Sequence, residues 1–459
     1  MADEVFKPFE SVYRSTNLRT KGNPNSVANE VKDLREDVSR GFERVQDQLV
    51  EGQLVQNGFE NRTDSTMSFD DATGTFSISP VGESYIIWAG GEKYIITETK
   101  TVTINTSIEG AHYIYFDSSG AVLDTTTFDP VVIISNSAYC AFVYWDADNS
   151  EALLFGDERH GIEMDSATHF LMHQAFGTQY LSGLTIALTT DGNGDNPEHA
   201  QFAVSNGRIA DEDITHVIAD GSPQELTPIC KAPIFYRAGA SGVWRKIAAT
   251  DYIVATTGSG RAAWNEFTGA TWQLTEVDNN DFVNMHIFAT GDLNNPIIII
   301  MGQVEHNSTV SVRAGAPDEI SILSLGSLAT LTPEFKAIGT AICQSGNGYA
   351  NAVMTRTRTT DEGDDYIDFR NTNASGSGFT ATDHGLLSGL SDDDHPQYLT
   401  QDRIVLPSYT VAEANDGVSI ADGYVEAQLI YVSDETGGAV PAFYNGTDWR
   451  RITDRNIIS

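Results

Sequence analysis

Positive charge is scarce in this sequence. Its 459 residues include 27 lysine and arginine residues against 64 aspartate and glutamate residues, which gives a formal net charge of −37. Nucleic acids and anionic membrane surfaces attract clusters of basic side chains. We therefore expect no nucleic-acid partner and no membrane insertion. The excess of one sign favours a soluble protein whose copies stay dispersed until they assemble.

Cysteine and long apolar runs are also scarce. The three cysteines, Cys140, Cys230 and Cys343, are odd in number, far apart and flanked by apolar residues. This pattern predicts buried, reduced thiols and production in a reducing cytoplasm. The apolar run Ile297–Met301 is far shorter than the roughly 18 residues that span a bilayer, so it predicts a buried strand. The acidic N-terminus lacks the apolar core of a signal peptide.

The N-terminal segment predicts an arm followed by a helical stalk. Residues 1–25 mix charged and aromatic side chains with a Gly-Asn-Pro-Asn breaker, so we expect an attachment arm that orders on a partner. In residues 26–58, apolar side chains recur every three or four positions, as on one face of a helix. A lone helix with a narrow apolar stripe is marginal in water. Either the chain's own β-domain or other copies of the helix cover this stripe, and its strongly charged polar faces favour self-association. The stripe consists of Val27, Val31, Leu34, Val38, Phe42, Val45 and Leu49.

The middle of the chain predicts β-structure. Alternating polar and apolar residues recur in short runs that are separated by turn signals. Examples are strands on either side of Gly90-Gly91 and a strand over Val131–Ile134. We expect two β-domains, residues 66–155 and 156–368. The fold prediction is thus mainly β: an N-terminal α-helical oligomerisation stalk followed by antiparallel β-sandwich-like domains in an elongated chain.

Few residues of the middle region suggest chemistry. His169 and His173 have the helical i, i+4 spacing of a metal-binding pair, but no glutamate completes a zinc-hydrolase motif. A metal pair and ordinary packing beside Phe170 and Met172 are both open interpretations. Residues 191–196 resemble half of a calcium loop, but the glycine and glutamate that an EF-hand requires are absent, so a polar turn is favoured.

Enzymatic motifs are missing from the sequence. It contains no nucleophile elbow, phosphate-binding P-loop or His-Glu-x-x-His motif. The sequence therefore predicts no catalytic residues, and we expect that the protein is not an enzyme.

Residues 369–403 predict a flexible connector that carries a distinctive motif. The motif runs from Asp383-His384-Gly385 through Asp392-Asp393-Asp394-His395 to Tyr398-Leu399. Its leucines, Leu387, Leu390 and Leu399, are too few to bury themselves in one chain, whereas three copies around an axis bury them together. His384 and His395 predict either a structural metal ion on that axis or hydrogen bonds to the neighbouring carboxylates.

Four parts of the sequence resemble tail-fibre and related virion proteins of tailed bacteriophages. They are residues 155–161 with Met164-Asp165 and Thr168-His169, residues 257–274, the connector motif at 383–399, and the C-terminal residues 404–459 with Tyr431-Val432-Ser433-Asp434 and Trp449-Arg450-Arg451. Residues 404–459 also predict a small β-module, in which strands 430–432 and 442–444 pair and Trp449 covers them. The resemblance implies a virion appendage protein, usually a homotrimer.

The functional hypothesis is therefore a structural phage appendage, a tail fibre or related fibre. It forms homotrimers, docks on other virion proteins of the tail, baseplate or collar by residues 1–25, and presents β-domains toward a host-surface glycan or protein for adsorption. Its location is the virion, after assembly in the host cytoplasm. Two alternatives are open: an architectural collar, baseplate or head fibre without receptor contact, and an appendage-borne polysaccharide depolymerase.

Overall fold

The computed structural model describes residues 55–372 except 324–327, 329, 330 and 332, and residues 408–459 except 417–428, 437, 454 and 459. The chain divides into two compact units, residues 1–382 (unit 1) and 383–459 (unit 2). The described parts are mainly β, as the sequence predicts. The stalk stripe from Val27 to Leu49, the leucines Leu387, Leu390 and Leu399, and the histidines His384 and His395 lie outside the described residues.

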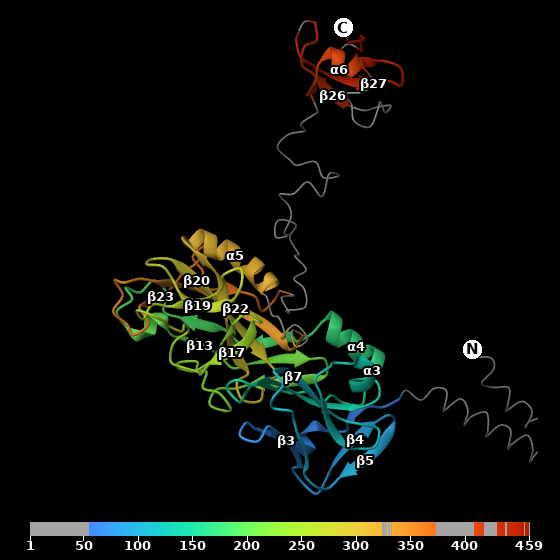
Figure 1. Cartoon of the computed structure of the whole chain (residues 1–459), viewed down its shortest axis with the longest axis vertical. Coiled ribbons are helices and arrows are strands. Elements are labelled where there is room, and N and C mark those ends of the chain that lie inside the picture. The colour runs from blue at the N-terminus through green and yellow to red at the C-terminus, as the bar shows by residue number, and fades with distance from the viewer. Residues whose placement is uncertain are drawn as a thin grey trace, which may run out of the picture. The chain divides into compact units, whose positions relative to one another are not determined.

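Three sheets form the N-terminal part of unit 1 (Figure 1). The first, in the order β1-β4-β5, joins β1 (Gly58–Phe59), β4 (Tyr85–Ala89) and β5 (Glu92–Ile96). The second, in the order β2-β3-β6, joins β2 (Ser65–Asp70), β3 (Thr75–Pro80) and β6 (Lys100–Thr103). The third, in the order β10-β9-β7-β8, joins β7 (Gly110–Phe116), β8 (Val122–Thr125), β9 (Ala138–Asp146) and β10 (Glu151–Asp157). All pairs within them are antiparallel.

Local turn chemistry correctly predicts one hairpin and fails at a neighbouring segment. The β4–β5 hairpin turns at Gly90 and Gly91, whose φ values of 61° and 79° suit the left-handed turn that glycine favours. The predicted strand over Val131–Ile134 is wrong, because this segment forms α3 (Pro130–Ile133). Asp129 caps this helix by accepting hydrogen bonds from the amides of Val131 and Val132, and Pro130 occupies its first position.

The rest of unit 1 is built around a seven-stranded sheet with the order β17-β16-β21-β20-β22-β23, to which β24 adds on β22. Its strands are β16 (Ile234–Ala238), β17 (Val243–Ile247), β20 (Phe282–Thr290), β21 (Ile297–His306), β22 (Phe335–Ser345), β23 (Thr355–Arg358) and β24 (Ile367–Asp368). The β16–β21 pair is parallel. The run Ile297–Met301 is fully buried in β21, as its apolar sequence predicts.

Smaller sheets and helices complete unit 1. The sheet β11-β14-β15 joins β11 (Gln179–Gly183), β14 (Gly207–Asp211) and β15 (Ile214–Ile218). Two-stranded pairs form from β12 (Ile186–Leu188) with β13 (Phe202–Val204) and from β18 (Ala263–Phe267) with β19 (Trp272–Glu276). The helices are α4 (Ser166–Ala175), α5 (Thr309–Ile322) and the short 3-10 turns η1 (Arg62–Asp64) and η2 (Pro197–Ala200). Within the described residues, no helix is long and apolar enough to cross a membrane.

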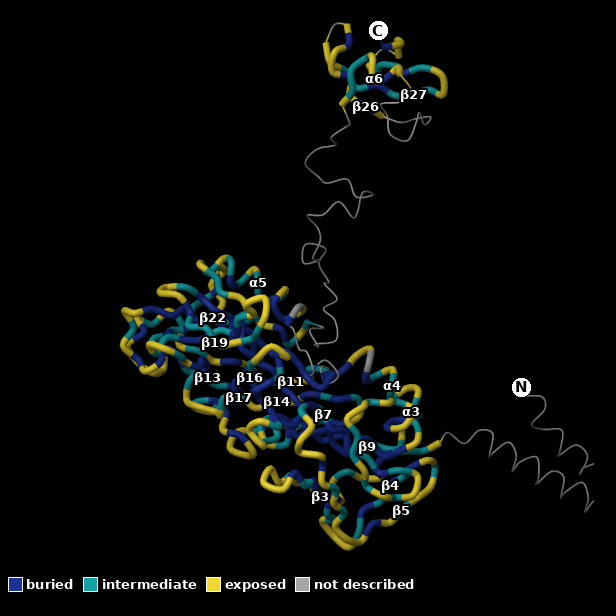
Figure 2. The backbone as a smooth tube through the Cα atoms, viewed as in Figure 1, coloured by how far each residue is buried: buried dark blue, intermediate teal, exposed yellow. Residues whose placement is uncertain are grey.

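One hydrophobic core joins the two halves of unit 1. It packs Tyr113, Phe142 and Leu154 of the sheet β10-β9-β7-β8 against Phe235 and Phe288 of the seven-stranded sheet. Figure 2 shows the buried chain running without interruption between these sheets. The segment that links the halves, from β10 through α4, therefore lies beside a shared core.

The three cysteines are buried and form no disulfide, as predicted. Burial raises the pKa of each thiol above its ordinary value. All three are therefore packing residues without the exposed thiolate of a reactive cysteine.

Unit 2 is a four-stranded sheet with one short helix. It contains β25 (Ser408–Tyr409), α6 (Val411–Asn415), β26 (Leu429–Val432), β27 (Val440–Tyr444) and β28 (Trp449–Arg451), with the strands in sequence order. The predicted pairing is confirmed, since Ile430 lies opposite Ala442. Trp449 is 1 % exposed and packs with both residues.

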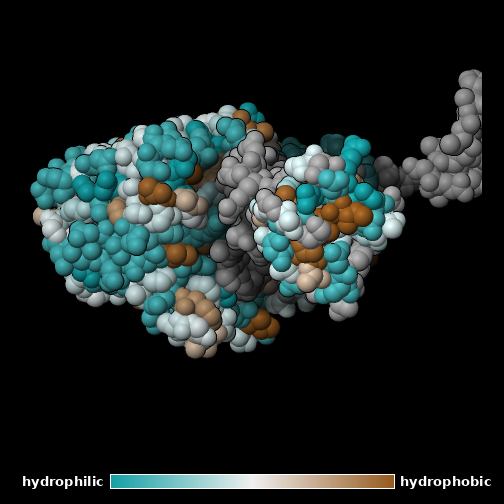
Figure 3. Space-filling view, turned by 90° about the horizontal axis from the view of Figure 1, so that it is seen from above, coloured by the Kyte–Doolittle hydropathy of each residue, from teal (hydrophilic) through white to brown (hydrophobic). Residues whose placement is uncertain are grey.

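The visible surface is mostly hydrophilic, with apolar side chains in small separate patches (Figure 3). In unit 2, the exposed apolar side chains include Leu429, Ile452 and Ile457. The hydrophilic surface agrees with the acidic composition of the chain.

Candidate metal centre

Four segments of unit 1 that are distant in sequence meet in one buried cluster of histidines and carboxylates. The segments are the loop after β10, the helix α4, the turn between β14 and β15, and the residue before β22. We call this group the His-carboxylate cluster, and its members are Glu158, His160, His169, His173, Asp211, Glu212, Asp213 and Glu334.

The backbone of β1 fixes the position of His160. The amide of Phe59 donates a hydrogen bond of 2.8 Å to the carbonyl oxygen of His160. Gly58 allows this close approach, since its φ is +118° and a Cβ there would lie 2.5 Å from the same oxygen. His160 is therefore held by the first strand of the unit.

A tight turn presents the two acidic residues Glu212 and Asp213. They connect β14 to β15, and Glu212 has a φ of 43°, in the left-handed region that residues other than glycine seldom occupy. Asp213 accepts hydrogen bonds from Nδ1 of His160 at 2.7 Å and from the amide of Gly161 at 2.6 Å. The strained turn thus places one carboxylate on each side of the His160 ring.

The helix α4 brings two further histidines to the cluster. Asp165 caps the helix by accepting hydrogen bonds from the amides of Ala167 and Thr168. The i, i+4 spacing then places His169 and His173 on the same helical face. The rings of His160 and His169 lie with their centroids 4.4 Å apart.

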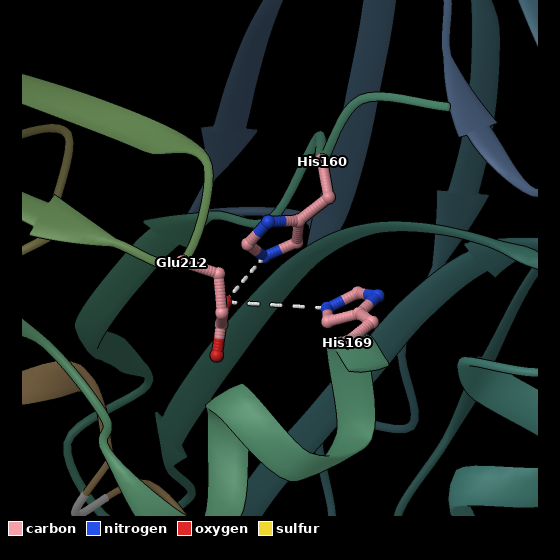
Figure 4. Close-up of side chains that lie close together, drawn as sticks. All are labelled: His160, His169 and Glu212. Carbon is pink, nitrogen blue, oxygen red and sulfur yellow. Dashed lines mark ion pairs between the residues drawn. The ribbon is translucent and has the colours of Figure 1, made fainter. Parts of the chain in front are cut away.

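The carboxylate of Glu212 faces the rings of His160 and His169 (Figure 4), and its other oxygen faces His173. Its Oε2 is 3.2 Å from Nε2 of His160 and 4.0 Å from Nε2 of His169, and its Oε1 is 3.3 Å from Nδ1 of His173. The Glu212 side chain is only 1 % exposed. Despite these short distances, neither Glu212 oxygen accepts a well-oriented hydrogen bond, and Nε2 of His169 has no hydrogen-bond partner.

Hydrogen bonding fixes the state of the His160 ring. Burial alone would raise the pKa of Asp213, but the hydrogen bond and charge of His160, together with the hydrogen bond from the amide of Gly161, lower it below its ordinary value. Asp213 accepts a hydrogen bond from Nδ1 of His160, and Nε2 on the other side of the ring faces Glu212 at 3.2 Å and Glu158 at 3.3 Å. A carboxylate that holds one nitrogen of a histidine while the other faces a cation is the usual arrangement around bound metals.

The cluster carries more carboxylates than its surroundings neutralise. Burial raises the pKa of Glu158 to about 7, and burial together with Asp211 raises the pKa of Glu334 well above its ordinary value. Burial and repulsion from His160 lower the pKa of His169 to about 2, so its imidazole is neutral. A neutral imidazole is the form that binds metal ions.

Two arginines beside the cluster are already engaged. Both Arg62 and Arg159 bind the carboxylate of Asp157, at 2.8 Å and 2.7 Å. Arg159 also donates hydrogen bonds to Ser65. Neither side chain is therefore available to neutralise Glu212.

A small cavity adjoins the histidines. It has a volume of about 10 Å³ and is lined by His160, His169, Ser137 and Tyr139, among other residues. This volume corresponds to about one water molecule. A cation bound by the histidines and Glu212 would therefore have room for a water ligand and not for a substrate.

The structure clarifies the two candidate metal sites of the middle region. It places His169 and His173 in a buried cluster that also contains His160 and Glu212, two residues that the sequence analysis did not connect with the helical pair. At the other candidate, the carboxylate of Asp191 binds Arg358 and Thr359, so this segment is a polar turn.

Sequence reasoning missed the remaining cluster residues for a physical reason. Glu158 and His160 lie shortly before the helical histidines in the sequence, and this local concentration of histidine and glutamate was a usable signal. Glu212 and Glu334 come from remote turns with no local motif, so only the tertiary fold brings them in.

The comparisons with known proteins give no relative for this chain. No protein-family model, no curated protein and no solved structure matches it.

Proposed function

We propose that the chain is a structural, non-enzymatic component of a tailed-bacteriophage appendage, a tail fibre or related fibre that acts in the virion. In this proposal, three copies associate through the stalk stripe, residues 1–25 dock on another virion protein, and the β-rich units face the host surface for adsorption. The fold expected of the assembly is elongated, with antiparallel sandwich-like domains beyond a helical stalk.

The observation that carries this proposal is the position of the connector motif. Residues 383–399 resemble a connector found in phage fibres, and in the sequence they lie between the described residues of unit 1, which end at 372, and those of unit 2, which begin at 408. The boundary between the units comes from the fold, whereas the resemblance comes from the sequence alone. Their agreement supports a chain built from separate modules that a fibre connector joins.

The β-rich character of both units agrees with the same proposal. Sheets supply most of the buried surface, and the small cavity beside the His-carboxylate cluster holds about one water. Catalysis needs a pocket that admits a substrate. The His-carboxylate cluster is therefore not the catalytic site that the depolymerase alternative needs.

Light scattering of the full chain tests the proposed trimer. We expect three times the chain mass of 49.9 kDa for the wild type. Leu34→Asp with Val38→Asp introduces charge into the stalk stripe, so we expect this variant to be monomeric. The matched control, Asp33→Asn with Asp37→Asn, changes the polar face and is expected to stay trimeric. A monomeric wild type, or a trimeric stripe variant, would contradict the proposed assembly.

Immunogold labelling of phage particles tests the location. An antibody against unit 2 is expected to label an appendage of intact particles from the phage that encodes the chain. Labelling at the tip supports host contact, whereas labelling at the collar or head supports the architectural alternative. Purified particles that contain none of the chain by mass spectrometry would overturn the virion proposal.

A further inference from the structure

We infer that unit 1 binds one divalent transition-metal ion of the zinc class, with His160, His169 and Glu212 as its protein ligands. The ion cross-links three segments of unit 1, namely the loop after β10, the helix α4 and the β14–β15 turn. This inference is independent of the proposed appendage function, because it rests on the side chains of one unit.

The donor atoms are spaced as a four-coordinate zinc ion requires. Tetrahedral zinc binds histidine nitrogen and carboxylate oxygen at about 2.0–2.2 Å, which separates the ligand atoms by roughly 3.3–3.5 Å. The two Glu212–histidine distances of 3.2 Å and 4.0 Å lie on either side of this range. All three donor atoms lie within 4.8 Å of one another. The longer Glu212–His169 distance must therefore close by about 0.5 Å for an ion to bind both atoms, which a rotation of the side chains can supply.

The ligand atoms of His169 and Glu212 lack other partners, whereas Nε2 of His160 also lies 3.3 Å from Oε2 of Glu158. Nε2 of His169 and both oxygens of Glu212 are buried without a hydrogen bond. Such atoms are costly in a folded protein, since burial removes water and nothing replaces it. A cation between them satisfies all three ligand side chains at once.

Neighbouring residues orient the ligands. Asp213 holds Nδ1 of His160, and Nδ1 of His173 lies 3.3 Å from the Glu212 oxygen that faces away from the other two histidines. The water-sized cavity next to His160 and His169 supplies a place for the fourth ligand. The set therefore has both the ligands and the supporting partners of a metal site.

The chemistry of the donors selects the class of ion. Two imidazoles and one carboxylate suit zinc and similar transition metals, whereas calcium and magnesium prefer oxygen ligands alone. Because the cavity accommodates a water and no substrate, we assign the ion a stabilising role. It joins the loop after β10 and the helix α4 to Glu212, which comes from a turn that is remote in sequence.

A protonated cluster is the competing explanation. In that case protons on His160, His173 and the buried carboxylates balance the charge, and no ion binds. The two explanations differ in their response to added zinc and in the effect of an isosteric change at Glu212.

Isothermal titration of the chelator-treated full chain with Zn²⁺ tests the inference. We expect saturation at one ion of this class per chain, with Ca²⁺ and Mg²⁺ failing to compete at equal concentration. Glu212→Gln preserves the shape of the side chain, and we expect it to weaken zinc binding by more than tenfold. His169→Gln is expected to do the same. Circular dichroism spectra that match the wild type show that each variant is folded.

Two control variants make the result specific. Asp281→Asn removes a carboxylate from the exposed acidic group of Asp278, Asp281 and Glu305, and its zinc affinity is expected to equal that of the wild type. His384→Gln with His395→Gln removes the histidines of the connector and is expected to keep the site in unit 1. Absence of saturable binding by the folded wild type would overturn the inference in favour of the protonated cluster. Unchanged affinity in folded Glu212→Gln, or loss of the ion only in the connector variant, would overturn it as well.

Discussion

Two buried charged groups of unit 1, one around Arg159 and the other around Glu212, differ in how their polar atoms are satisfied. The guanidinium of Arg159 binds Asp157 through two hydrogen bonds of 2.7 Å and donates others to Ser65 and to the carbonyl of Arg62. In contrast, Glu212 meets the His160 and His169 rings without a well-oriented hydrogen bond. Arg159 and Asp157 thus find their hydrogen-bond partners within the chain, whereas the geometry around Glu212 is that of a site in which a ligand supplies the missing partner.

This difference shows that the burial of a charged side chain does not by itself identify a functional site. Both groups are buried and both contain carboxylates, but the donors of Arg159 are matched to acceptors in a fixed geometry. Only the His-carboxylate cluster combines converging donor atoms, missing hydrogen bonds and a water-sized cavity.

Removing the charge of Arg159 should have the largest effect on stability. Arg159→Met leaves the buried Asp157 and Ser65 without their main partner, so we expect a loss of about 3–5 kcal/mol in the free energy of unfolding, with or without zinc. Urea denaturation measures it. Lys100→Met removes an exposed ion pair with Glu98 and should leave the free energy of unfolding almost unchanged, because solvent screens this pair. A loss below about 1 kcal/mol for Arg159→Met would show that the buried Arg159–Asp157 pair contributes little to the stability of the fold.

Glu212→Gln should abolish most of the stabilisation by zinc. At a free zinc concentration one hundred times the wild-type Kd, binding to the native state adds about 2.7 kcal/mol to its stability. We expect the variant to gain less than about 1 kcal/mol under the same conditions. Thermal unfolding with and without zinc measures both values. An equal gain in the two proteins would place the ion elsewhere.

Lys336 is a third buried charged residue. Its Nζ donates a hydrogen bond to the neutral carbonyl oxygen of Thr372. Burial lowers the pKa of Lys336 from 10.5 to about 8. The unfolded chain therefore binds more protons than the native protein between pH 8 and 10.5, so this group destabilises the protein below pH 8 and its cost is relieved as the pH rises.

Comparison with Lys336→Met isolates this contribution. Relative to the variant, the wild type should gain about 2 kcal/mol of stability between pH 7.5 and 10.5. Urea denaturation across this pH range checks the prediction. A difference between the two proteins that stays constant with pH would contradict the lowered pKa.

Asp213→Asn should have a smaller effect than a change of a zinc ligand. The amide still reaches His160 but no longer fixes its ring as strongly, so we expect zinc affinity to fall about tenfold, or about 1.4 kcal/mol. Isothermal titration measures the affinity, and unfolding without zinc serves as the control for structural damage. Unchanged affinity would show that Asp213 does not orient the ligand.

The sequence predicts the parts of this fold that depend on local pattern. Gly90-Gly91 predicts the β4–β5 hairpin, and the apolar run Ile297–Met301 predicts a buried strand. The pairing of Ile430 with Ala442 is predicted as well. These predictions succeed because turn geometry and apolar patterns act over a few residues. The error at Val131–Ile134 has a local cause as well. An aspartate cap and a proline at the first helical position outweigh the strand preference of the apolar residues between them.

The candidate site could be predicted only in part. The spacing of His169 and His173 is visible in the sequence, since both lie on one helical face. Asp213, however, follows His160 by 53 residues, and the sheet β11-β14-β15 must form before its turn reaches the histidines. Long-range convergence of this kind has no signature in a single sequence.

Zinc K-edge X-ray absorption of the zinc-loaded full chain tests whether His160, His169 and Glu212 bind the ion. We expect a shell of four nitrogen and oxygen ligands at about 2.0–2.1 Å, with the outer scattering of two imidazoles. In Glu212→Gln this spectrum should be lost or altered. A six-oxygen spectrum of a hydrated ion in the wild-type protein, without imidazole scattering, would contradict it.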